Sequence, residues 1–169
     1  MQFSVVLLAA LTTAVAAKPT FFLIRHAEKN DDGTISSQGM QREQCLISVF
    51  GRDSGYNIQH IMVQTPHAGD AKSQRPYNTT LPLANSLGLN IDSPCDYDDP
   101  QCAANAALQY TGGNVLIAWE HKELRHVAEA LGADDVPKYP GDHFDLIYTL
   151  PEPYTEVSIS SESCPGLDN

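Results

Sequence analysis

The sequence predicts a single α/β domain of three layers, α/β/α, in which a mainly parallel sheet lies between two layers of helices. Its 169 residues are typical of one domain. Short apolar runs, typical of strands buried on both faces, occur at Thr20–Ile24, Ile58–Val63 and Val115–Ala118. Each run is followed by a segment of helical character, and this alternation predicts right-handed crossovers with helices on both faces of the sheet.

Four segments have helical character. The first begins at Ser36 or Ser37, either of which can cap a helix, and it runs to about Phe50, before Gly51. The other three segments are Arg75–Leu87, Gln101–Tyr110 and His121–Leu131. Arg75–Leu87 carries Pro76 in its first turn, where proline is tolerated.

The remaining chain predicts strands and one long loop. Phe144–Leu150 and Thr155–Ser160 are β-prone and are expected to be the last two strands. Asn90–Pro100 is acidic, and we expect it to be a loop.

The first 17 residues are typical of a secretory signal peptide. Val5–Ala17 is apolar apart from two threonines, and it ends in small residues suited to cleavage. It is shorter than the ~20 residues that a membrane-spanning helix needs, although a hydrophobic strand or an anchor stays an alternative. We therefore expect a secreted, extracellular protein whose folded domain is residues 18–169, with no membrane association after cleavage.

Four cysteines fit two disulfides in an oxidising compartment. They allow three pairings. We favour Cys95–Cys102, which closes a short loop, and Cys45–Cys164, which ties the first helix to the C-terminal tail. Asn78 begins a glycosylation sequon whose occupancy the sequence leaves open.

The chain is strongly acidic, with a formal net charge of −11. Such a charge disfavours nucleic acids and anionic membranes as partners. It also repels anionic substrates at long range, so any affinity for phosphate must come from a local basic cluster.

Charged residues follow the buried runs where a sheet would open into a site. Arg25 and His26 end the first run, and Glu120 and His121 end the third. The carboxyl ends of parallel strands lie at one edge of a sheet, where ligands bind. Arg75 begins the helix after the second run, with Lys72 as the competing cation. These residues predict a basic pocket for an anion.

At these residues the chain resembles the histidine phosphatase superfamily, also called phosphoglycerate mutase-like. LIRHAEK (Leu23–Lys29) resembles the family's strand-terminal Arg-His signature. QRPYNTTLPLANSLGL (Gln74–Leu89) is similar to its second-arginine helix, and NVLIAWEH (Asn114–His121) to the strand that carries its second histidine. The layout is closest to short, secreted fungal-type members, which share the C-terminal Cys164–Asp168 segment.

The resemblance implies a phosphoglycerate mutase-like fold and a phosphatase acting on a small phosphomonoester through a phosphohistidine. His26 would be the nucleophile. Arg25, Arg75 and His121 would be catalytic and substrate-binding, since they would hold the phosphoryl oxygens. The family needs no metal or other cofactor, and we expect a monomer.

The proton donor is not assigned by the resemblance. Some relatives place Asp directly after the second histidine, and here that position is Lys122. Three carboxyl groups are candidate donors: Glu28, Glu120 and Asp92. Glu28 has an alternative role, which is to orient an arginine. An active donor would require a tuned carboxyl and would give a low-to-neutral pH optimum.

Other functions stay open at this point. The unassigned acid leaves room for a pseudo-enzyme that binds a phosphorylated ligand without turnover. A phosphoglycerate-type phosphomutase is a further alternative, although the short chain leaves little room to cover its substrate. A metallohydrolase using His26, Glu28 and His121 is a distant fourth, because no helical His-x-x-x-His spacing occurs.

Overall fold

The computed structural model describes residues 18–168. The predicted signal peptide, Met1–Ala17, lies outside the described residues. The helices are α1 (Ser37–Phe50), α2 (Ala71–Leu87), α3 (Pro100–Leu108) and α4 (His121–Leu131). The strands are β1 (Phe21–Arg25), β2 (Ile58–Gln64), β3 (Ile91–Cys95), β4 (Asn114–Trp119), β5 (Leu146–Leu150) and β6 (Ser158–Ser161).

The described strands form one six-stranded sheet in the order β3-β2-β4-β1-β5-β6. The strands from β3 to β1 are parallel to one another, whereas β5 is antiparallel to both β1 and β6. The predicted mainly parallel sheet is therefore confirmed. The parallel strands β2, β4 and β1 end at one edge, and the candidate residues follow them there.

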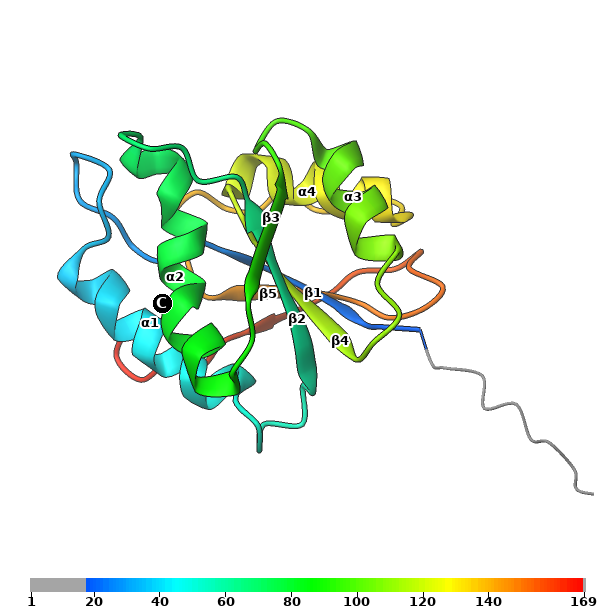
Figure 1. The fold of residues 1–169 in the computed structure, drawn as a ribbon, viewed down its shortest axis with the longest axis horizontal. Coiled ribbons are helices and arrows are strands. Elements are labelled where there is room, and N and C mark those ends of the chain that lie inside the picture. Colours follow the sequence, from blue (N-terminus) through cyan, green and yellow to red (C-terminus); the bar gives the residue numbers. More distant parts are fainter. Residues whose placement is uncertain (1–17, 169) are drawn as a thin grey trace, which may run out of the picture.

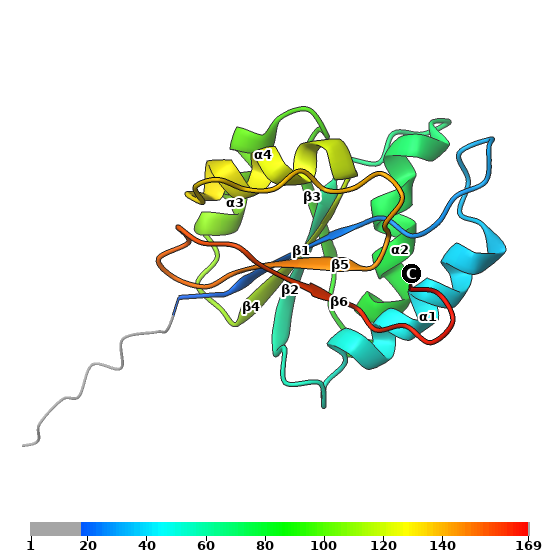
Figure 2. The same ribbon diagram turned by 180° about the vertical axis from the view of Figure 1, so that it is seen from behind.

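Helices cover both faces of the sheet (Figures 1 and 2). Alternate residues of β1 pack against different helix layers, because successive side chains of a strand point to opposite faces of the sheet. Phe21 and Leu23 pack in the cluster with α3 and α4, whereas Phe22 and Ile24 pack in the cluster with α1 and α2. The predicted three-layer α/β/α arrangement is thus present.

Two local predictions are wrong. Residues 91–95 were expected in a loop, but they form β3 at the sheet edge. Its polar sequence and Pro94 are features that an edge strand tolerates. Helix α2 begins at Ala71 rather than Arg75, because the Asp70 side chain accepts the backbone N–H groups of Lys72 and Ser73 and caps the helix.

Both favoured disulfides are present, Cys45–Cys164 and Cys95–Cys102. The first joins α1 to the C-terminal tail, which Figures 1 and 2 show beside that helix. The second closes the loop between β3 and α3. In the described part of the chain, no helix has the length and apolar character needed to cross a bilayer.

Candidate active site

Strands β1 and β4 end at paired residues, and this brings the segments that follow the two strands close together. Arg25 is paired in register with Trp119. His26 and Ala27 therefore leave the sheet beside Glu120 and His121. The backbone N–H of Ala27 donates to Thr79 Oγ1 at 2.9 Å, which ties this turn to α2. The sheet edge and the α2 helix thus converge on His26.

Hydrogen bonding decides which nitrogen of His26 carries the proton. Nδ1 lies 2.7 Å from the carbonyl oxygen of Ala27. Since a carbonyl oxygen only accepts, Nδ1 must be the donor. Nε2 therefore carries the lone pair in the neutral ring, and Nη1 of Arg75 lies 3.3 Å from it. His26 presents an unprotonated nitrogen toward a guanidinium.

The surroundings keep His26 neutral. Its exposed fraction is only 1 %. Burial lowers the pKa of His26 to about 3; the Ala27 hydrogen bond opposes this shift, and the positive charges of Arg25 and Arg75 reinforce it. The ring is therefore unprotonated throughout the neutral and mildly acidic range.

Arg25 is anchored through one end of its guanidinium. Nη1 donates to the carbonyl oxygens of Gly141 and His143 at 2.9 and 2.6 Å. The carbon of the guanidinium lies 3.7 Å from the centre of the Phe144 ring, a cation–π contact. Burial lowers the pKa of Arg25, yet an arginine stays charged.

Arg75 is held by a loop that the sequence did not single out. Its Nε donates to the carbonyl oxygen of Gly33 at 2.8 Å. Gly33 has φ +91°, and a Cβ there would lie 3.3 Å from Nη2 of Arg75. Of the two competing cations, Arg75 contacts His26, whereas Lys72 is exposed at the start of α2.

Glu120 and His121 lie at the junction of β4 and α4. Gln64 accepts the backbone N–H of Glu120 at 3.0 Å, and the Glu120 carboxylate caps α4 through the N–H of Lys122 at 2.7 Å. Glu120 Oε1 is 2.8 Å from His121 Nδ1. The carboxylate of Glu120 thus contacts both the imidazole of His121 and the first turn of α4.

One buried donor of this site has no hydrogen-bond partner among the described residues. It is Nε of Arg25. Because an unpaired buried donor is costly, native proteins leave few of them, often at functional sites. Arg25 directly precedes His26, so this donor can bind an oxygen of an acceptor-rich group next to the imidazole.

A cleft of about 450 Å³ opens next to these residues. Arg75 borders it and also contacts His26, so it connects the cleft with the buried imidazole. Both charge signs and an aromatic side chain occur on its walls. The residues that line the cleft include Gln64, Lys72, Arg75, Tyr97, Glu120 and Lys122.

The three candidate proton donors lie in different surroundings. Glu120 borders the cleft. Glu28 binds Arg42 through both carboxylate oxygens, the arrangement in which it orients an arginine. Asp92 lies on the edge strand β3 and faces His60 at 3.7 Å. Only Glu120 of the three borders the cleft together with Arg75.

Three contributors to the site were missed by sequence reasoning. Gly33 holds Arg75, Thr79 holds the turn after β1, and Gln64 bridges β2 to Glu120. Gln64 had a usable signal, since it ends a buried strand as Arg25 does. Gly33 lies in a polar turn and Thr79 lies in the middle of a helix, and neither position has a sequence pattern that indicates a site. In residues 18–168, no three His, Cys, Asp or Glu side chains are arranged to hold a metal ion.

Solved structures with this fold include known phosphatases. The protein histidine phosphatase SixA complexed with tungstate has a TM-score of 0.53 at 14% identity, over 85% of this chain and 97% of that one. A mycobacterial glucosyl-3-phosphoglycerate phosphatase has a TM-score of 0.52 at 12% identity, over 85% and 97%. A phosphoglycerate mutase from Plasmodium falciparum has a TM-score of 0.51 at 10% identity, over 89% and 92%.

The sequence matches no family model and no curated protein. At such low identity the structural likeness concerns the fold. The chain is a single α/β domain with a phosphoglycerate mutase-like fold, as its sequence predicted.

Proposed function

We propose that this protein is a secreted phosphatase that hydrolyses a small phosphomonoester through a phosphohistidine at His26, without a metal ion. One observation carries the proposal: a buried imidazole directs its unprotonated Nε2 toward the guanidinium of Arg75. The unpaired Nε of Arg25 supports it, because a phosphoryl group offers oxygens to such donors.

The first step would be an in-line displacement. The Nε2 lone pair of His26 attacks phosphorus, the N–P bond forms, and the bond from phosphorus to the leaving oxygen breaks. Arg25, Arg75 and His121 hold the remaining phosphoryl oxygens. Fixed positive groups stabilise the charge of the transition state, and they do so strongly in a buried site.

The leaving oxygen then needs a proton, and we assign its delivery to Glu120. Burial raises the pKa of Glu120, but His121 and the N–H of Lys122 outweigh burial, so the net pKa is lowered. A bound phosphate dianion would oppose this lowering and favour a proton on the carboxyl. In the second step, Glu120 takes a proton from the water that attacks phosphohistidine, which releases inorganic phosphate and restores His26.

The test compares two histidine variants on an aryl phosphate. His26→Ala removes the nucleophile and is expected to lower turnover by about 10³-fold or more. His67→Ala is the matched control, because His67 is an exposed histidine paired with Asp96, and it should retain wild-type turnover. Undiminished activity of His26→Ala would reject the phosphohistidine route.

The lowered pKa of Glu120 favours one alternative, a protein that binds a phosphorylated ligand without turnover. A donor that is ionised cannot protonate an alkoxide. Calorimetry with a phosphomonoester, together with an assay for inorganic phosphate, separates the two functions. Heat of binding without phosphate release supports the non-catalytic protein.

Secretion is part of the proposal. The two disulfides are consistent with an oxidising compartment. We propose that residues 1–17 are removed on export. Expression in a secreting host, followed by N-terminal sequencing of the medium, should find a chain that begins near Lys18; retention of the protein in the cell would contradict this.

A further inference from the structure

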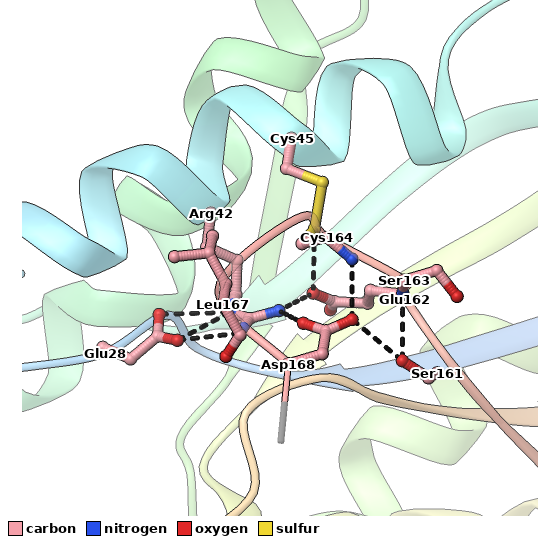
Figure 3. The surroundings of a disulfide bond; sticks show 9 residues. All are labelled: Glu28, Arg42, Cys45, Ser161, Glu162, Ser163, Cys164, Leu167 and Asp168. Carbon is pink, nitrogen blue, oxygen red and sulfur yellow. Dashed lines mark hydrogen bonds and ion pairs between the residues drawn. A yellow bond between two sulfur atoms is a disulfide. The ribbon is translucent and has the colours of Figure 1, made fainter.

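A buried arginine on α1 connects the C-terminal tail to the turn that carries His26. Arg42 is 1 % exposed. It binds Glu28 through Nε and Nη2, and through Nη1 it binds Glu162 at 2.6 Å and Asp168 at 3.0 Å. Figure 3 shows these carboxylates around the guanidinium. Among the described residues, two of its three acidic partners come from the C-terminal tail, Glu162–Asp168.

The tail is itself folded around Asp168. Its Oδ2 accepts the backbone N–H of Cys164 and the hydroxyl of Ser161. The carbonyl oxygen of Leu167 accepts Nη2 of Arg42 at 3.3 Å. The Cys45–Cys164 bond joins this turn to α1, one helical turn from Arg42 (Figure 3). The disulfide and the ion pairs thus hold the tail at one place.

The disulfide is the strongest of these attachments. It links residues separated by 119 positions. A cross-link that closes so long a loop keeps the tail close to its binding site at high effective concentration. Without it, the ordering of the tail would depend on its ion pairs and on the β6 pairing alone. Burial raises the pKa of Glu162, and the positive charge of Arg42 opposes that rise.

The other end of the network reaches Arg75. Glu28 begins the loop that leads to α1, and its carbonyl oxygen accepts the N–H of Ser36. A Cβ on Gly39 would clash with that same oxygen, which shows how closely α1 packs on Glu28. This loop carries Gly33, whose carbonyl oxygen holds Nε of Arg75.

We propose that the C-terminal segment Glu162–Asp168 positions Arg75 for phosphate, through Arg42, Glu28 and the Gly33 loop, and that reduction of Cys45–Cys164 weakens phosphate binding. The inference rests on the proposed function of the same site. It adds a redox dependence: the protein works with full affinity only where this disulfide is formed. Arg42 and the tail are positioning groups, since they do not border the cleft.

The redox step requires a dithiol reductant. One thiolate attacks a sulfur of the Cys45–Cys164 bond and forms a mixed disulfide; the second thiolate of the reductant then displaces the other cysteine. The products are two protein thiols and one cyclic, oxidised dithiol. In this exchange the only protein bond that breaks is Cys45–Cys164, and the tail then contacts α1 through non-covalent interactions alone.

The experiment measures the affinity of the full chain for inorganic phosphate by calorimetry, with and without dithiothreitol. Wild type should lose about tenfold in affinity on reduction, the value of one hydrogen bond to a charged group. The double variant Cys45→Ala/Cys164→Ala retains Cys95–Cys102, so it shows whether reduction of that second disulfide affects phosphate affinity. It should bind weakly from the start and should not respond to the reductant. Wild-type affinity in this variant would overturn the proposal.

A second variant keeps the proposal testable if the double variant fails to fold. Asp168→Asn retains the disulfide but weakens one ion pair to Arg42, and about a threefold loss of phosphate affinity is expected. Asp168→Glu should restore part of the affinity. Glu156→Gln, at an exposed site, is the control. Unchanged affinity in Asp168→Asn, at a temperature where circular dichroism shows a folded chain, would contradict the proposal.

These readouts are independent of turnover. If wild type binds phosphate and responds to reduction but releases none from any ester, the phosphatase function fails while the positioning role stands. If turnover is normal and phosphate affinity ignores both the tail variants and the reductant, the positioning role fails alone.

Discussion

Nη1 of Arg75 lies 3.3 Å from Nε2 of His26, on the side of the imidazole opposite the nitrogen that donates to Ala27. The contact fixes two properties at once. It directs a positive group toward the lone pair of the proposed nucleophile, and it disfavours a proton on the same nitrogen. The chemistry proposed for the site depends on both.

The titration of His26 is the first consequence. Burial, together with the neighbouring arginines, lowers its pKa to about 3. In the unfolded chain the ring takes up a proton near pH 6.5. The stability that depends on neutral His26 is therefore present above pH 6.5 and is lost as the pH falls toward 3. NMR of the labelled ring should show a neutral His26 at pH 5; a midpoint near 6.5 would contradict the described burial.

Removal of Arg75 should damage catalysis more than removal of its neighbour on the same helix. Arg75→Ala deletes a buried positive group beside Nε2 and should lower kcat/KM by about 10²–10³-fold. Lys72→Ala is the matched control, because Lys72 is exposed and borders the cleft without contacting His26. Equal losses in the two variants, measured on an aryl phosphate, would remove Arg75 from its proposed role.

Gly33 offers a sharper test of how Arg75 is held. Alanine at φ +91° is strained by about 1–2 kcal/mol, and its Cβ would crowd Nη2 of Arg75. Gly55→Ala introduces comparable strain at φ +82° with nothing within 4 Å. Both variants should lower the unfolding temperature, and only Gly33→Ala should also weaken phosphate affinity. A comparable loss of affinity in Gly55→Ala would show that strain alone is responsible.

Glu120→Gln separates proton delivery from structure. Glutamine keeps an oxygen that can accept the N–H of Lys122, so the cap of α4 is preserved. Hydrolysis of an alkyl phosphate should fall by about 10²-fold, since its leaving oxygen needs a proton. An aryl phosphate, with a better leaving group, should lose little. Equal losses on both substrates would argue against Glu120 as the donor.

The sequence predicted which charged residues stand at the ends of strands, because a buried run that ends in charged residues is a local pattern. Arg25, Glu120 and the turn after β1 were placed at one edge of the sheet in this way. Strand β3 was not, because an exposed edge strand containing Pro94 lacks the apolar signal. The contacts of Gly33 with Arg75 and of Arg42 with the tail were also not predicted, because they join segments far apart in the chain. Such contacts produce no periodic pattern in the sequence.

Trapping of the phosphorylated protein tests the central claim most directly. The chain is mixed with a phosphomonoester, quenched with alkali so that a phosphoramidate bond survives, and digested for mass spectrometry. The phosphoryl group should be found on the His26 peptide, should be lost on acid treatment, and should be absent in His26→Ala. Turnover without any phosphate on His26, or with phosphate on another residue, would contradict the account.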